Sequence, residues 1–389
     1  MVAPLSLHRV LGPGLLSLSV VCGSACGSSN PGTPSGDAGA ADGGGVTCEG
    51  VDLQESAEHC GRCGHSCGSA ACTAGVCELQ LLKEMRAGSV IQAQALNGTL
   101  YFNVDDSIQS LSATNDLRNF GAYQNFFATS DRVFAINTFR NDLDVIPLAS
   151  GEAGKIVPKV DTPSIGEIRE VVSDGADLYL NVRHDNGTEG TAIHRVPSAP
   201  GNPVPELVYD SGGVKQSGAV LRLFVDQGTV YFVGVKSSAF GLYKLDDTAA
   251  PLWSLSSSRF LDVNGGRAAG FRSESVLEVR AADGAVSKFD VAATEQGVIF
   301  GDSVYLTSVS GSGGDPTQWS ATVRRVPLDG KPVEVLKQVD LTKDKPANDT
   351  APARGELHMA RDDKAIYWAL LQGDARSADK TLRLWKWVP

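Results

Sequence analysis

The chain has 389 residues, of which 42% are hydrophobic and 20% are charged. This composition indicates a globular protein, because a disordered chain would be less apolar. The 45 acidic and 34 basic residues give a formal net charge of −11. We therefore expect no nucleic-acid partner, since proteins that bind phosphate backbones concentrate Lys and Arg. All eight cysteines lie within the first 77 residues, which separates an amino-terminal part from a cysteine-free remainder.

The first 25 residues have the three-part layout of a secretory signal peptide. Arg9 supplies a positive charge, residues 10–21 are mostly apolar, and the small residues Ser24 and Ala25 precede a cysteine. The apolar stretch contains Pro13 and is too short to span a bilayer. We expect residues 1–25 to be absent from the mature, exported protein.

Cys26 is the first residue of the expected mature chain. The small residues before it and the flexible segment after it resemble the lipobox of bacterial lipoproteins, with Gly23 in place of the usual aliphatic residue. This resemblance implies lipid attachment at Cys26, and several acyl chains anchor a protein stably. Plain secretion with cleavage near Ala25 is the alternative. Residues 26–47 are rich in Gly, Pro, Ser and Ala and predict a flexible linker.

Residues 48–77 form a cysteine-rich module. Its cysteines are Cys48, Cys60, Cys63, Cys67, Cys72 and Cys77. So short a segment buries too little apolar surface to fold unaided, and an even cysteine count after an export signal predicts three disulfides. The pairing stays open, because six cysteines allow 15 arrangements. A zinc site is the alternative, since His59 and His65 stand among the cysteines.

The spacing of the last five cysteines is Cys-Gly-x-Cys-Gly-x-x-Cys-x-x-x-x-Cys-x-x-Gly-x-Cys. Together with the preceding linker, this run resembles a module of exported lipoproteins of myxobacterial type. The resemblance covers residues 48–77 and implies export without implying any chemistry.

From residue 78 onward, short alternating segments typical of β-strands are separated by Gly, Asp and Asn turns. The clearest unit has four such segments, and its second segment contains an aromatic anchor that recurs along the chain. The anchors are Tyr101, Phe134, Tyr179, Tyr231, Phe271, Tyr305 and Tyr367. Their mean spacing of about 44 residues is typical of β-propeller blades, in which such side chains pack between neighbouring blades.

We therefore predict an all-β fold in which residues 78–389 form a seven-bladed β-propeller. The anchor strands, and third strands such as residues 323–330, resemble propellers of the YWTD type found in lipoprotein receptors, although Thr-Asp does not follow the aromatic pair. The last unit contains three strands only, and residues 78–85 precede the first unit. Because a closed ring leaves no unpaired edge, we predict that this amino-terminal segment completes the seventh blade.

Four long segments follow second or fourth strands of the predicted blades, at residues 183–190, 309–320, 342–356 and 372–380. The segments after second and fourth strands emerge on one face of a propeller, and binding surfaces are commonly built from loops on a rigid scaffold. We predict binding at this face. The candidate residues are His184, Asp185, Asp315, Trp319 and His358.

The function expected from the sequence is non-catalytic binding or scaffolding at the bacterial cell envelope. The expected partner is a protein or a saccharide, and a lipid anchor is the expected link to the membrane. We expect a monomer without cofactor or metal, located at the outer membrane or cell surface, or otherwise periplasmic or secreted. The alternative is a lactonase-like or lyase-like enzyme acting on a small ester or saccharide, with His184 and His358 near the axis.

Overall fold

The computed structural model describes residues 48 and 50–389, apart from 138–141, 150–153, 158–165, 184–189, 199–203, 212–219, 237–238, 256–258, 295, 311–319, 341–352 and 375–379. Within these residues every regular element is a β-strand. Accordingly, the described part of the chain contains no helix long and apolar enough to cross a membrane.

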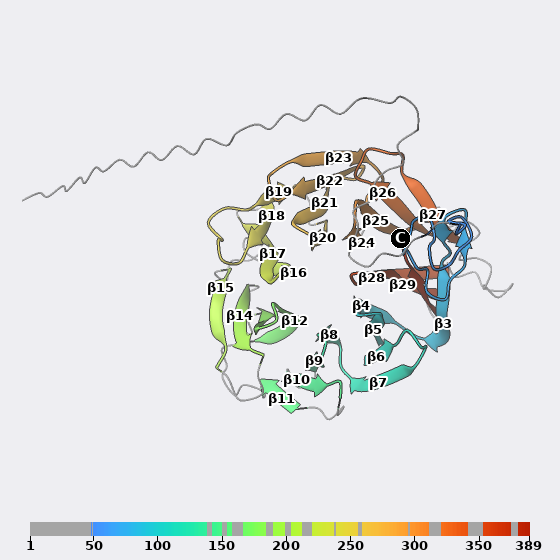
Figure 1. The fold of residues 1–389 in the computed structure, drawn as a ribbon. Coiled ribbons are helices and arrows are strands. Elements are labelled where there is room, and N and C mark those ends of the chain that lie inside the picture. The colour runs from blue at the N-terminus through green and yellow to red at the C-terminus, as the bar shows by residue number, and fades with distance from the viewer. Residues whose placement is uncertain are drawn as a thin grey trace, which may run out of the picture. The chain divides into compact units, whose positions relative to one another are not determined.

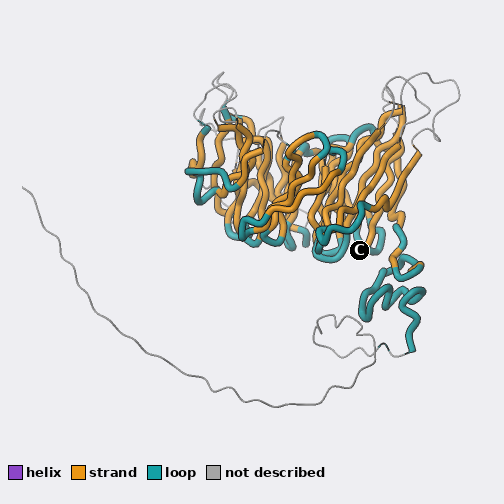
Figure 2. Tube along the Cα trace, turned by 90° about the horizontal axis from the view of Figure 1, so that it is seen from above, coloured by secondary structure: helices purple, strands orange, loops and turns teal. Residues whose placement is uncertain are grey.

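Seven four-stranded antiparallel sheets form a closed ring (Figure 1). Each sheet is one blade, and its first strand lies nearest the axis. Neighbouring inner strands contact one another around the whole ring. Seen from the side, the strands run between two edges of the ring, where the turns lie (Figure 2). The prediction of an all-β, seven-bladed propeller is confirmed.

The first three blades follow one another along the chain. Blade 1 contains β4 (Val90–Leu96), β5 (Thr99–Val104), β6 (Ser107–Leu111) and β7 (Leu117–Ala122). Blade 2 contains β8 (Asn125–Ala128), β9 (Arg132–Asn137), β10 (Asp142–Pro147) and β11 (Gly154–Val157). Blade 3 contains β12 (Glu167–Ser173), β13 (Asp177–Arg183), β14 (Thr191–Pro197) and β15 (Glu206–Asp210).

The next three blades repeat this arrangement. Blade 4 contains β16 (Val220–Asp226), β17 (Thr229–Lys236), β18 (Ala239–Lys244) and β19 (Trp253–Leu255). Blade 5 contains β20 (Phe260–Asn264), β21 (Arg267–Ser273), β22 (Val276–Ala281) and β23 (Val286–Asp290). Blade 6 contains β24 (Gln296–Phe300), β25 (Ser303–Ser310), β26 (Ser320–Pro327) and β27 (Glu334–Asp340).

Blade 7 joins the two ends of the propeller chain. Three of its strands are carboxy-terminal, namely β28 (Ala353–Arg361), β29 (Ile366–Asp374) and β30 (Lys380–Trp387). Its outermost strand is the amino-terminal β3 (Gln80–Ala87), which pairs antiparallel with β30 from Gln80–Lys386 to Ala87–Lys380. The predicted closure of the seventh blade by the amino-terminal strand is therefore confirmed.

The propeller core consists of seven buried apolar clusters, one at each interface between neighbouring blades. Most anchor aromatics contribute to the interface with the following blade. Blade 5 differs, because Phe271 does not stand at the anchor position of its strand. Ala269 stands there and pairs with Asp262. Phe271 lies two residues further along β21 and is fully buried in the same cluster. The sequence therefore indicated the blade correctly and its anchor two residues too late.

The cysteine-rich module contains a two-stranded ribbon of β1 (Cys72–Thr73) and β2 (Val76–Cys77). Its three disulfides are Cys48–Cys63, Cys60–Cys72 and Cys67–Cys77. This confirms the disulfide interpretation and resolves the pairing, and all six sulfurs are used, so the thiolates that the zinc alternative needs are absent. The indole Nε1 of the buried Trp387 donates a 2.8 Å hydrogen bond to the carbonyl oxygen of Cys77.

Candidate functional site at the ring axis

The inner strands place a polar side chain at an equivalent position in almost every blade. In six blades this residue pairs with the residue two positions after the anchor aromatic of the second strand. In blade 5 the corresponding polar residue is Asp262, which lies one pair further along β20 and pairs with Ala269. We call this set the axial collar: Gln92, Asn125, Glu170, Arg222, Asp262, Gln296 and His358.

The collar side chains of blades 1 and 2 bond to the backbone of the next inner strand. The amide of Gln92 accepts from the N–H of Phe126 at 3.1 Å and donates to its carbonyl oxygen at 2.9 Å. Gln94 makes the same pair of bonds with Ala128. Asn125 donates from Nδ2 to the carbonyl oxygen of Arg169 at 2.8 Å. These amides replace the backbone ladder that inner strands of different blades cannot form.

Blades 3 to 5 continue the pattern with charged groups. Glu170 accepts a 2.9 Å bond from the N–H of Leu223. Arg222 donates to the carbonyl oxygen of Leu261 at 3.3 Å, and Asp262 accepts from the N–H of Ile299 at 2.9 Å. The group at each position thus matches a backbone donor or acceptor in the following blade.

Blades 6 and 7 close the collar. Gln296 accepts a 3.0 Å bond from the N–H of Met359, and its Nε2 lies 3.1 Å from Nδ1 of His358. His358 in turn bonds to the backbone of Val90, the first residue of β4. Burial lowers the pKa of His358, against the opposing effects of Glu356 and the Val90 bond. The imidazole is therefore a neutral structural group that joins blade 7 to blade 1.

One ion pair links inner strands that are not neighbours. Nε of Arg361 in β28 lies 3.0 Å from Oδ2 of Asp262 in β20, and the guanidinium also reaches the carbonyl oxygen of Val263. Blade 6 separates these two strands in the ring order. The pair joins blade 7 to blade 5, and both side chains are largely shielded from solvent, at 22% and 14% exposed.

Glu170 is the collar residue with the most altered acidity. Burial raises the pKa of its carboxyl to about 7, although Arg222, the N–H of Leu223 and the amide of Asn181 each act to lower it. A carboxyl of this kind exchanges its proton near neutral pH, whereas an ordinary glutamate is ionised well below it.

At the start of several inner strands a β-bulge turns one residue out of register. The bulge residues Ile91 and Leu221 are 48% and 45% exposed, and the bulge residue Arg169 pairs with Glu167 at 3.6 Å. Bulges re-aim side chains and interrupt pairing. Apolar and charged groups are thereby presented at the edge of the ring where first strands begin and second strands end.

This edge is the one from which the sequence predicted binding. His184, Asp185, Asp315 and Trp319 all lie outside the described residues, as does the lipid-attachment residue Cys26. His358 is described, and the structure places it in the collar.

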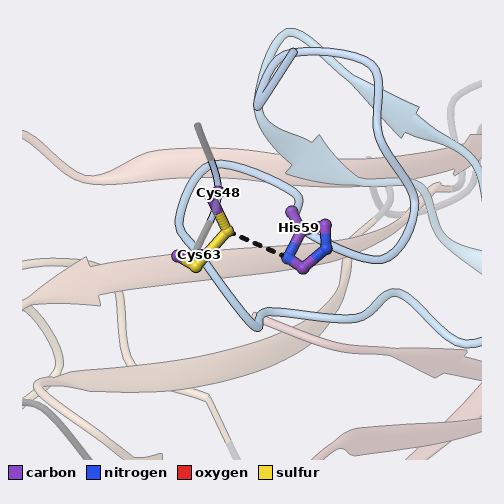
Figure 3. Close-up of side chains that lie close together, drawn as sticks. All are labelled: Cys48, His59 and Cys63. Atoms are coloured by element: carbon purple, nitrogen blue, oxygen red, sulfur yellow. Dashed lines mark hydrogen bonds between the residues drawn. A yellow bond between two sulfur atoms is a disulfide. The ribbon is translucent and has the colours of Figure 1, made fainter. Parts of the chain in front are cut away.

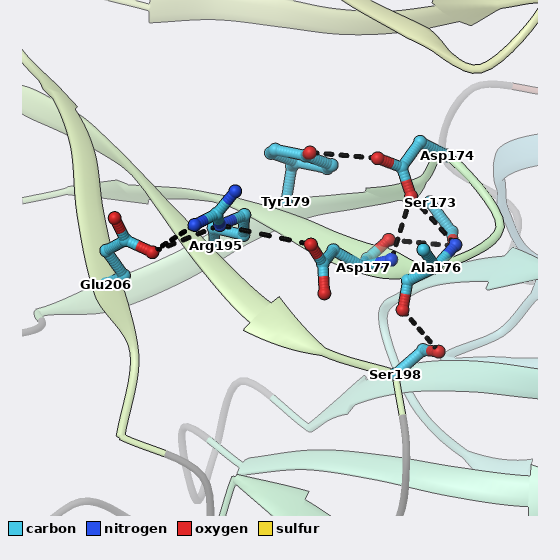
Figure 4. Close-up of polar contacts among 8 residues, drawn as sticks. All are labelled: Ser173, Asp174, Ala176, Asp177, Tyr179, Arg195, Ser198 and Glu206. Carbon is cyan, nitrogen blue, oxygen red and sulfur yellow. Dashed lines mark hydrogen bonds and ion pairs between the residues drawn. The ribbon is translucent and has the colours of Figure 1, made fainter.

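A polar network in blade 3 has a structural explanation (Figure 4). Asp174 accepts hydrogen bonds from the N–H groups of Ala176 and Asp177 and from the hydroxyl of Tyr179. Burial alone would raise the pKa of Asp174, but these bonds outweigh it and hold the pKa below its ordinary value. Burial and the same carboxylate raise the pKa of Tyr179 to about 12. The network stabilises the turn between β12 and β13.

Comparison with known proteins identifies the fold alone. No protein-family model matches the chain, and no curated protein matches its sequence. A prolyl endopeptidase structure is 12% identical over 79% of this chain and 51% of its own, with a TM-score of 0.50. This chain thus spans about half of that enzyme's length.

Two further structures have lower scores. The propeller domain of the trilobed protease from Pyrococcus furiosus is 12% identical over 78% of this chain and 96% of its own, with a TM-score of 0.48. A quinohemoprotein alcohol dehydrogenase from Pseudomonas putida is 8% identical over 78% and 67%, with a TM-score of 0.46.

Proposed function

We propose that the protein is a non-catalytic binding or scaffolding propeller of the bacterial cell envelope. In this proposal a protein or saccharide partner docks at the edge of the ring where second strands end. Among the described residues, the exposed bulge residues Ile91 and Leu221 belong to that surface.

The observation that carries this proposal is the bonding of the axial collar. A general acid, base or nucleophile must be able to reach a substrate. In the described part of the chain, the collar side chains bond to the backbone of the next blade; His358 also contacts the side chain of Gln296, and Asp262 also pairs with Arg361. Groups used in this way hold the ring together and are poorly suited to chemistry on a ligand.

The second part of the proposal is export followed by lipid attachment at Cys26. The linker of residues 26–47 would let the folded part stand clear of the membrane, since a random coil of this length spans about 25 Å. We place the protein on the outer membrane or cell surface.

Site-specific photo-crosslinking tests the binding surface. A photoreactive phenylalanine analogue at position 319 is expected to capture an envelope partner. The same analogue at Lys331 is the matched control, because that side chain is 72% exposed in the turn after the third strand of the same blade. Equal capture from both positions, or capture from position 331 alone, would contradict the proposed surface. Hydrolysis of a lactone panel that His358→Ala abolishes would instead favour an enzyme.

The mass of the mature protein tests lipid attachment. The wild-type chain is expected to begin at Cys26 with covalently bound acyl groups and to partition into detergent. Cys26→Ser is expected to lose both properties while retaining the circular dichroism of a β-protein. An unmodified wild-type mature chain would disprove the anchor without affecting the binding proposal.

A further inference from the structure

The three disulfides of the module differ in their access to solvent. Cys60 and Cys72 are 1% and 8% exposed, and Cys67 and Cys77 are 2% and 3% exposed. These two disulfides form the buried centre of the module. Cys63 is exposed and its partner Cys48 is partly exposed. A thiol in solution therefore meets the Cys48–Cys63 bond first.

A histidine lies against this accessible disulfide (Figure 3). Nδ1 of His59 is 3.3 Å from Sγ of Cys48 and accepts a 3.0 Å hydrogen bond from the N–H of Gly64. The Gly64 bond fixes the orientation of the ring and marks Nδ1 as the acceptor nitrogen. The sulfur that would depart when the disulfide is attacked thus faces a nitrogen able to accept a hydrogen bond from its thiol.

We propose that Cys48–Cys63 is a thiol–disulfide exchange site for small-molecule thiols. A thiolate attacks Sγ of Cys63 and forms a mixed disulfide with it. The Cys48–Cys63 bond breaks, its electron pair goes to Sγ of Cys48, and that sulfur takes up the proton that the attacking thiol lost; the new S–H then donates a hydrogen bond to Nδ1 of His59. A second thiolate attacks the mixed disulfide, releases the oxidised small-molecule disulfide and leaves Cys63 reduced.

The balance of this exchange is simple. Two thiols are oxidised to one disulfide, and one protein disulfide is reduced to two thiols. Exchange depends on access to the attacked sulfur and on stabilisation of the departing one, and the structure provides the first at Cys63 and the second at Cys48.

The exchange leaves the rest of the fold intact. The two buried disulfides, the β1–β2 ribbon and the bond from Trp387 to Cys77 involve neither Cys48 nor Cys63. Opening Cys48–Cys63 releases only the amino-terminal end of the module at Cys48, because the carbonyl oxygens of Leu53, Gln54 and Ala57 stay bonded to the rest of the module. The exchange site is thus separate from both ring closure and the proposed binding surface.

The test is a time course of the purified full-length mature protein with reduced glutathione, stopped by acid and iodoacetamide and read by peptide mass spectrometry. The expected first products carry glutathione on Cys63 and a free thiol on Cys48, with the other four cysteines still paired. Initial opening of Cys60–Cys72 or Cys67–Cys77, or attachment at Cys48 in preference to Cys63, would overturn the proposal. Absence of any glutathione adduct would do so equally.

Replacing the histidine tests its part in the step. His59→Ala is expected to slow formation of the Cys63 adduct about fivefold or more, and added imidazole is expected to restore part of the rate. His65→Ala is the matched control, since Nε2 of His65 lies 3.6 Å from Sγ of the buried Cys77, and its rate of Cys63 modification should match wild type. An unchanged rate in His59→Ala with both buried disulfides intact would remove His59 from the mechanism.

Discussion

Glu170 shows how one residue of the collar can make the whole ring sensitive to pH. Its blade 1 equivalent is Gln92, which makes the same kind of interblade contact with an uncharged amide. A carboxyl at this position is stable in its protonated form, because burial opposes ionisation. Ionising it in the folded protein has a free-energy cost that a glutamine avoids.

The sign of the pH effect follows from the raised pKa. A glutamate with a folded-state pKa of about 7, against an ordinary value near 4.5, contributes stability below pH 4.5 that is lost as the pH rises through 7. The shift corresponds to about 3 kcal/mol. Glu170→Gln is therefore expected to raise the melting temperature at pH 8 by several degrees and to leave it nearly unchanged at pH 5. Glu167→Gln, on the exposed part of β12, is the control, and an equal gain from Glu170→Gln at both pH values would contradict this origin.

The collar itself could not be predicted from the sequence. Residues such as Gln92 and Glu170 stand in alternating segments, where polar positions ordinarily face solvent. They bond across the blade interfaces because the inner strands of neighbouring blades contact one another around the ring without a shared backbone ladder. That proximity depends on the closed ring and has no local signal.

At the scale of single elements, β3 is the strand on which closure depends. Its burial alternates, and Leu82 and Ala87 belong to the cluster between blades 7 and 1. The bulge between Leu81 and Lys83 turns Leu82 into that cluster while Leu81 remains 50% exposed. Two adjacent leucines of one strand thus have opposite environments.

These two leucines give a matched test of the closing strand. Leu82→Asp is expected to lower the free energy of unfolding by about 3 kcal/mol or more, because it removes buried apolar surface and introduces a charge in its place. Leu81→Asp is expected to change stability by roughly 0.5 kcal/mol or less. Urea unfolding followed by tryptophan fluorescence measures both. Similar losses from the two variants would show that β3 is not packed as described.

The strands and their closure were predictable for a physical reason. A blade needs four short strands. The carboxy-terminal unit contains only three, and one amino-terminal strand segment belonged to none of the repeated units. The register of blade 5 was harder, because Ala269 occupies the anchor position and Phe271 fills the same cluster from two residues away. The core between two blades needs apolar side chains of sufficient volume, and a large side chain at either position 269 or position 271 can fill it.

At the scale of the whole molecule, the cysteine module and the propeller are joined through Trp387. Its indole packs against Tyr305 and Trp368 in the cluster between blades 6 and 7, while its N–H bonds to Cys77. The distribution of cysteines in the sequence was enough to distinguish the two parts. The cysteine module is stabilised by disulfides, and the cysteine-free propeller is stabilised by apolar packing. The bond between them depends on a backbone carbonyl, for which the sequence carries no signal.

Trp387→Phe tests this coupling. The substitution leaves an aromatic ring in the cluster and removes the donor to Cys77, so we expect a loss of about 1–2 kcal/mol in unfolding free energy. Trp385→Phe, two residues earlier on the same strand, is the control and should cost less. Thermal unfolding monitored by circular dichroism distinguishes them. A larger loss from Trp385→Phe would contradict the importance of the Cys77 bond.

The pairing of β3 with β30 also fixes when the protein can finish folding. β3 begins at Gln80 and its partner β30 begins at Lys380, so the first propeller strand to be synthesised is the last to find its partner. Contacts between such distant residues form slowly, and an unpaired strand edge invites wrong partners meanwhile. If the chain crosses a membrane amino end first, β3 must wait on the far side until the final residues arrive. A chain that lacked β30 would have no strand with which β3 could pair.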